Sequence, residues 1–222
     1  MPFASGIATR LTFTGGSYPK WSPDGKHVYY DNAGNIYKRA ADGSGAEELL
    51  AKGSFLSSVS PDGKHLLYGI GDIFLLPLEG EKKAAPYLQT KFNEGGAVFS
   101  PDGRWVAYNS DESSRSEVYI QGFPERRGKW QVSADGGGFP QWRADGKELY
   151  WNGNDIRSVM AAPMELQAAG VKAGRPELLF RAPHPGVLSR DGKRFLVQNP
   201  EGGDQPSLPM VVVQHWAAGL GK

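Results

Sequence analysis

The stretch Ser22–Tyr30 reads SPDGKHVYY, and nearly the same nine residues return as SPDGKHLLY at Ser60–Tyr68 and as SPDGRWVAY at Ser100–Tyr108. A catalytic motif normally occurs once per active site, whereas a phrase that returns at a regular period marks a repeated unit of architecture. Two weaker copies, RADGKELYW at 143–151 and SRDGKRFLV at 189–197, continue the series. The phrase therefore predicts a repeat protein.

All five copies carry an aspartate at the same place, namely Asp24, Asp62, Asp102, Asp145 and Asp191. Successive aspartates are 38, 40, 43 and 46 residues apart. Apolar residues alternate on both sides of each Pro-Asp-Gly or Asp-Gly group, which is the pattern of a β-hairpin. Proline presets the turn, aspartate accepts a backbone hydrogen bond, and glycine supplies a positive φ. We therefore interpret the five aspartates as structural turn residues.

Each hairpin is followed by two more strand-like runs, such as NIYKRA and AEELLA after the first copy. Four strands in about 40 residues are typical of a β-propeller blade. We predict an all-β, five-bladed propeller of four-stranded antiparallel blades that forms a single domain over residues 1–222. The expected blades are 18–50, 54–90, 93–133, 137–182 and 183–216.

The fifth predicted blade lacks an outer strand of its own. We expect residues 9–14 to supply that strand, because the pairing would cover two exposed sheet edges and close the ring. Only MELQAAG, from Met164, has some helical character, and we expect a loop there.

Composition and charge exclude several classes of function. With 25 Lys and Arg against 24 Asp and Glu, the chain lacks the basic excess typical of nucleic-acid binding. It has no cysteine, which excludes disulfides and thiolate metal sites but does not fix the compartment. No apolar run approaches the roughly 20 residues of a membrane span, and the start MPFASGIATR lacks the apolar core of a signal peptide. We expect a soluble monomer. The sequence does not assign its compartment, which would be extracytoplasmic if the chain is a fragment of a larger membrane-anchored protein.

The run WSPDGKHVYY, from Trp21, resembles the TolB-type, WD-like propeller repeat. Two longer stretches, 92–124 and 128–151, and the ending VVVQHWAAGLGK are similar to the C-terminal propeller regions of large bacterial proteins that often carry an N-terminal Ser/Thr protein kinase. The first two repeats depart from those regions in having shorter loops between strands, DNAGN and GIGD. The resemblance implies a platform for protein interactions. It implies no catalysis, since the chain has no glycine-rich loop with its Lys, no His-Arg-Asp loop and no Asp-Phe-Gly.

Motifs for other chemistry are weak. There is no Gly-x-Ser-x-Gly elbow of a serine hydrolase, and the four histidines (His27, His65, His184 and His215) show no metal-ligand spacing. DNAGN and NGND offer oxygen ligands for calcium but lack the spacing of an EF-hand, so that turn formation explains them better. We predict no metal and no cofactor.

In a propeller, the loops from an outer strand to the next inner strand share one rim with the loops from the second to the third strand. Binding groups concentrate on loops carried by a rigid scaffold, so we predict that a protein or small ligand binds on this loop rim. The candidate residues are Tyr18, Asp31, Phe55, Phe92, Glu94, Asp111, Arg115, Phe139 and His184. The aromatic side chains would anchor the partner, and Asp31, Asp111 and Arg115 would orient it. Alternatively, the aromatic side chains only fill space between blades.

These observations favour a non-catalytic propeller that binds a protein or senses a ligand. The first alternative is a propeller enzyme, a lyase or glycan hydrolase, with carboxylates that converge at the channel mouth. The acids available for it are Asp31, Asp72, Glu94 and Asp111. The second alternative is a structural part of a larger protein.

Overall fold

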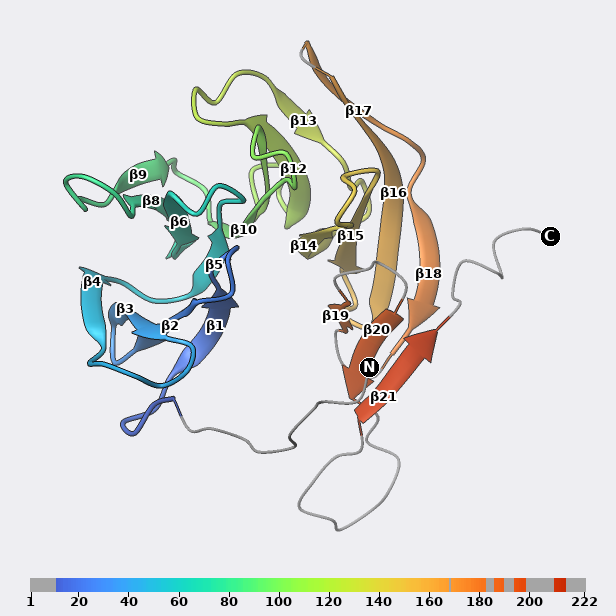
Figure 1. The fold of residues 1–222 in the computed structure, drawn as a ribbon. Coiled ribbons are helices and arrows are strands. Elements are labelled where there is room, and N and C mark those ends of the chain that lie inside the picture. The colour runs from blue at the N-terminus through green and yellow to red at the C-terminus, as the bar shows by residue number, and fades with distance from the viewer. Residues whose placement is uncertain (1–10, 168, 183–185, 190–193, 199–209, 215–222) are drawn as a thin grey trace. The chain divides into compact units, whose positions relative to one another are not determined.

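We analysed a computed structural model of the chain. It describes residues 11–167, 169–182, 186–189, 194–198 and 210–214. All regular elements within these ranges are β-strands (Figure 1), so the described residues contain no helix with the length and apolar character needed to cross a membrane. The chain divides into two compact units, an N-terminal unit (Met1–Leu88) and a C-terminal unit (Gln89–Lys222).

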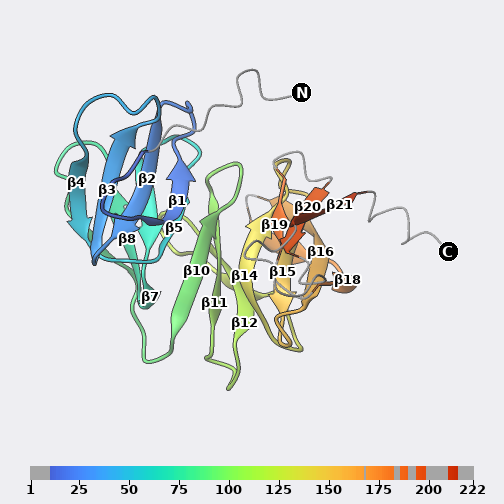
Figure 2. The same ribbon diagram turned by 90° about the horizontal axis from the view of Figure 1, so that it is seen from below.

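The N-terminal unit contains two antiparallel sheets of four strands each. The first has the order β1 (Ser17–Trp21), β2 (His27–Asn32), β3 (Asn35–Ala40) and β4 (Glu48–Lys52), which Figure 2 shows side by side. The second has the order β5 (Leu56–Val59), β6 (His65–Tyr68), β8 (Ile73–Pro77) and β9 (Ala85–Leu88), and the short β7 (Ile70–Gly71) lies between β6 and β8 in the chain. Each sheet thus holds one copy of the repeated phrase, at the turn between its first two strands.

The two sheets of this unit share one apolar core. Ile36 of β3 and Leu66 of β6 are completely buried, and Tyr29 and Leu56 belong to the same cluster. These are inward positions of the alternating pattern, because successive side chains of a strand point to opposite faces. Removal of this apolar surface from water is the main favourable contribution to the unit's stability.

The C-terminal unit holds the remaining repeats. Its strands β10 (Glu94–Phe99), β11 (Trp105–Ser110), β12 (Glu117–Gly122) and β13 (Lys129–Gln131) pair in that order. In the next sheet, β14 (Gly137–Trp142), β15 (Glu148–Gly153) and β16 (Ser158–Gln167) are followed by β18 (Glu177–Arg181), which pairs with β16. A third sheet has the order β19 (Val187–Leu188), β20 (Arg194–Gln198) and β21 (Met210–Gln214). Multiple antiparallel sheets built on one repeat agree with the predicted all-β class.

The loop expected from Met164 is wrong. Residues 164–167 continue β16 and pair with β17 (Gly170–Ala173), so that β16 extends beyond β15, as Figure 1 shows. The physical reason is packing, because Met164 and Val171 are buried in the core cluster that also contains Trp105. An apolar face on this hairpin outweighs the helical preference of the local sequence.

The strand expected at residues 9–14 is also not found in its described part, since residues 11–16 form no strand. Instead, the Asn32 side chain donates a hydrogen bond to Thr14 Oγ1 at 3.0 Å, and the Arg39 guanidinium lies over the Phe13 ring. Gly15 has φ +106°, which lets the chain turn into β1. Residues 9 and 10 lie outside the described residues, and the sheet β19–β21 has three strands among those described.

Candidate functional site

The repeated aspartates lie in the turns between the first two strands of a sheet. Asp24 accepts hydrogen bonds from Ser22 Oγ at 2.6 Å and from Lys26 N at 3.0 Å. Asp62 and Asp102 accept the equivalent pair of hydrogen bonds within their own turns. The carboxylate therefore fixes both sides of the turn to one another.

These hydrogen bonds favour the charged form of the carboxylates. The hydrogen bond from Ser60 holds the pKa of Asp62 below its usual range, and Arg143 does the same for the pKa of Asp145. Asp191 lies outside the described residues. The four described aspartates have their acceptor atoms occupied by the turn, which is an arrangement suited to structure.

The first strand of each of four repeats is interrupted by a bulge in its pairing with the second strand. At or next to the bulge, one residue adopts the left-handed conformation: Tyr18 (φ 50°), Phe55 (φ 59°), Gly96 (φ 61°) and Phe139 (φ 55°). Glycine is the usual residue in this conformation, and a bulky side chain there is an outlier. Three repeats nevertheless place an aromatic residue at this position.

These three aromatic side chains are accessible to solvent. Their exposed fractions are 49% for Tyr18, 40% for Phe55 and 62% for Phe139. In the N-terminal unit, the Tyr18 and Phe55 rings contact one another, with centroids 5.3 Å apart and planes tilted by 50°. Phe92 is half-buried under the Lys91 ammonium, and His184 lies outside the described residues. The sequence alone did not reveal that the exposed rings share a strained backbone conformation.

The polar residue at the end of the second strand holds the bulge of the following repeat. Asp31 is buried, and its Oδ2 accepts a hydrogen bond from Phe55 N. Asn109, at the same place in the third repeat, accepts a hydrogen bond from Phe139 N at 3.4 Å. The burial of Asp31 does not match its expected role in orienting a partner at an exposed rim, because its side chain faces the backbone of the next strand.

Two further candidate acids are also occupied within the fold. Glu94 is 3% exposed and accepts a hydrogen bond from Thr90 Oγ1. Asp111 accepts hydrogen bonds from Asn93 N at 2.9 Å and Asn93 Nδ2 at 2.6 Å, and these hold the pKa of Asp111 below its usual range. Both carboxylates connect neighbouring loop segments of the C-terminal unit.

Arg115 belongs to a polar cluster around a buried carboxylate that the sequence analysis missed. The Glu117 side chain is 1% exposed and accepts hydrogen bonds from Arg115 Nε at 2.7 Å, Gly136 N at 2.9 Å and Ser133 Oγ. Arg115 also donates to the Ala134 carbonyl, and half of its side chain stays exposed. An acid at the start of the apolar run EVYI was the available signal, since a buried charge needs partners.

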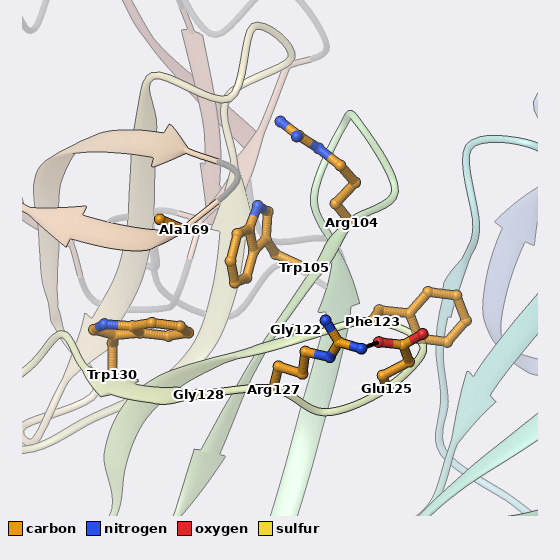
Figure 3. Close-up of a pocket in the computed structure, with 9 residues that line it drawn as sticks. All are labelled: Arg104, Trp105, Gly122, Phe123, Glu125, Arg127, Gly128, Trp130 and Ala169. Carbon is orange, nitrogen blue, oxygen red and sulfur yellow. Dashed lines mark ion pairs between the residues drawn. The ribbon is translucent and has the colours of Figure 1, made fainter.

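A pocket of about 460 Å³ lies at the other end of these strands, near the turn between β10 and β11 (Figure 3). Its walls come from the start of β11, the loop between β12 and β13, and the turn between β16 and β17, and they include Arg104, Trp105, Arg127, Trp130 and Ala169. The two indole rings stand edge to face with centroids 5.4 Å apart. The sequence pattern did not single out Trp105, which lies one residue before the alternating apolar positions Val106 and Tyr108.

The described residues contain no cluster of three or more His, Asp or Glu side chains placed to hold a metal ion. Cysteine, the remaining common ligand, is absent from the sequence.

No protein-family model matches the chain. An uncharacterized protein of Agrobacterium fabrum is 29% identical over 152 residues, which cover 60% of this chain and 49% of that protein. The chain thus spans about half the length of this curated relative.

Several solved structures have a similar fold. TolB from Acinetobacter baumannii aligns with a TM-score of 0.67 and 18% identity over 90% of this chain and 52% of its own. A putative TolB from Agrobacterium tumefaciens aligns with a TM-score of 0.55 and 20% identity over 81% of this chain and 87% of its own. The Cps50 (Swd1) β-propeller domain of Myceliophteria thermophila aligns with a TM-score of 0.60 and 10% identity over 95% of this chain and 89% of its own.

At these identities the comparison concerns the fold and not the activity. It agrees with the repeated hairpins, the antiparallel sheets and the turn aspartates. The chain has a TolB-like β-propeller fold.

Proposed function

We propose that this chain is a non-catalytic, five-bladed β-propeller module that binds a protein partner through exposed aromatic side chains at the bulges of its inner strands. The observation that carries the proposal is the shared conformation of Tyr18, Phe55 and Phe139, which combine a left-handed backbone with substantial exposure. Aromatic side chains are common anchors of protein interfaces because they bury a large area on binding.

The repeats differ in the residue that they place in the left-handed conformation at the bulge. A left-handed conformation costs a non-glycine residue roughly 1–2 kcal/mol, and exposure of the ring forgoes the gain from burial. The third repeat forms the same bulge with Gly96, so the fold does not require a ring there. Backbone strain that the fold does not require is typical of functional sites.

An enzyme with acids at a channel mouth is less well supported. Asp31 and Glu94, two of its four candidate acids, are buried and bonded to Phe55 N and Thr90 Oγ1. A hydrolase of this kind needs two carboxylates that reach the substrate.

The test is to replace Phe139 with glycine, the residue that the third repeat has at the equivalent position, Gly96. We expect the free energy of unfolding to change by less than about 1 kcal/mol, since relief of strain offsets the entropy lost by glycine. A protein captured from an extract of the source cells by the immobilised wild-type chain should be retained about fivefold less, because loss of an anchor costs over 1 kcal/mol. Quantitative mass spectrometry measures the captured amounts.

Leu178→Ala is the matched control, since Leu178 is an exposed apolar residue of the same unit that does not belong to a bulge between the first two strands of a sheet. It should leave capture unchanged. If Phe139→Gly unfolds the chain, the ring has a structural role and the proposal fails. The proposal also fails if the folded variant captures every protein as well as the wild type does.

A further inference from the structure

The pocket of Figure 3 is built rigidly around Trp130. Gly128 and Gly170 both lie close against its indole, and a Cβ at either would approach the ring to 2.0 Å and 2.8 Å, respectively. Trp105 packs its ring edge to face with this indole. The aromatic wall is therefore fixed before any ligand binds, and a preformed wall reduces the entropy cost of binding.

The pocket also offers an unusual excess of hydrogen-bond donors. Trp105 is 6% exposed, and its Nε1 has no hydrogen-bond partner among the described residues. Figure 3 shows this nitrogen at the edge of the indole turned toward Arg104 and away from Trp130. An indole N–H can only donate, and a buried donor normally finds an acceptor.

Two of the three charged residues of the wall, Arg104 and Arg127, are donors as well. Arg104 pairs with Asp102 at 2.8 Å and Arg127 with Glu125 at 2.6 Å. Each guanidinium carries five N–H donors in a planar fork, more than one carboxylate uses. Among the charged side chains of the wall, only Glu125 accepts hydrogen bonds.

We propose that this pocket binds a small planar carboxylate, an aromatic acid whose ring packs against Trp105 and Trp130. Its carboxylate accepts hydrogen bonds from Trp105 Nε1 and from Arg104. The cavity volume of about 460 Å³ lies in the usual range for small-molecule sites. This site is separate from the aromatic positions at the bulges and does not depend on the function proposed for them.

The probes are indole-3-acetate and its neutral amide, indole-3-acetamide, which differ only in charge and acceptor strength. The chain has six tryptophans, so an ¹⁵N-labelled sample gives few indole N–H signals, and the signal lost in Trp105→Phe is that of Trp105. We expect this signal to move on addition of the acid up to about 10 mM, a range that detects millimolar binding. The amide should bind at least about tenfold more weakly, since a charged acceptor forms the stronger hydrogen bond.

Two variants separate the site from the fold. Arg104→Gln should weaken binding of the acid about threefold or more, because it removes the guanidinium that binds the carboxylate. Trp142→Phe is the matched control, because Trp142 also has a buried indole N–H without a partner but does not line the pocket, and it should bind the acid as the wild type does. The tripeptide Gly-Gly-Trp, with a free or an amidated C-terminus, tests whether the ligand is the end of a peptide or a free aromatic acid. The proposal is supported if the pocket prefers the charged form of the tripeptide or of indole-3-acetate over its amide.

Equal shifts with acid and amide, or a Trp105 signal that does not move with any probe, would overturn the assignment. If Trp105→Phe fails to fold, Arg104→Gln decides, and unchanged affinity for the acid in that variant counts against the proposal.

Discussion

At the level of single residues, the left-handed position at the bulge holds a glycine in one repeat and an exposed aromatic residue in three others. Gly96 takes the left-handed conformation at little cost, whereas Phe55 takes it with a buried carboxylate, Asp31, bonded to its amide. The polar residue at the end of the second strand thus stabilises a backbone that the aromatic residue itself disfavours. Substitution at the bulge therefore tests function more directly than substitution in the core.

The turn aspartates predict how stability depends on pH. Hydrogen bonds hold the pKa of Asp24, Asp62 and Asp145 below their usual range. At Asp102 burial raises the pKa, but its hydrogen bonds together outweigh burial, so that the pKa is also lowered. A lowered pKa in the folded state means that the unfolded chain binds more protons in acid. The stabilisation is complete above the unfolded value of about 3.9 and is lost as the pH falls through the folded pKa.

We expect the urea midpoint to fall between about pH 5 and pH 2, and to fall less steeply in Asp62→Asn, which cannot be charged. Glu81→Gln, at an exposed position, is the control and should keep the wild-type slope. Parallel curves for Asp62→Asn and the wild type would show that this turn carboxylate does not contribute to the pH dependence.

At the level of elements, the hairpins could be predicted because each depends on local chemistry. The turn around Asp102 needs only Ser100, Gly103 and the alternating residues beside them, all within one phrase of sequence. The bulges and the β16–β17 extension could not be predicted, because they depend on contacts with distant residues. Val171 is buried in a cluster with Trp105, and Phe139 N is held by Asn109.

Close packing of glycine against Trp130 gives a second prediction. Gly128 and Gly80 have nearly the same conformation, with φ of 65° and 66°, but a Cβ at Gly128 would overlap the indole while a Cβ at Gly80 would meet nothing within 4 Å. Both alanine variants introduce the same backbone strain. We expect Gly128→Ala to lower the free energy of unfolding by about 1–3 kcal/mol more than Gly80→Ala does, as overpacking of a rigid ring usually costs.

Chemical denaturation of both variants measures this difference. Equal destabilisation would mean that Trp130 moves aside freely, and the wall of the pocket would then not be rigid.

At the level of the whole molecule, the repeat runs through both compact units, although its later copies are weaker. The copies at Asp24 and Asp62 belong to the N-terminal unit, and those at Asp102 and Asp145 to the C-terminal unit. Blades of a repeat protein gain stability from their neighbours as well as from their own cores. We therefore predict that all repeats unfold together as one domain.

Tryptophan fluorescence tests this prediction, because five of the six tryptophans follow residue 88 and report on the C-terminal unit. Leu66 is completely buried in the N-terminal unit, and Leu66→Ala should cost about 2–5 kcal/mol through the cavity that it creates. If the repeats form one cooperative domain, this variant lowers the urea midpoint of the fluorescence transition, although no reporting residue of the C-terminal unit has changed. Leu149→Ala, completely buried in the C-terminal unit, should lower it in either case. A fluorescence transition that Leu66→Ala leaves in place, while circular dichroism shows an earlier loss of β-structure, would establish two independently folding units.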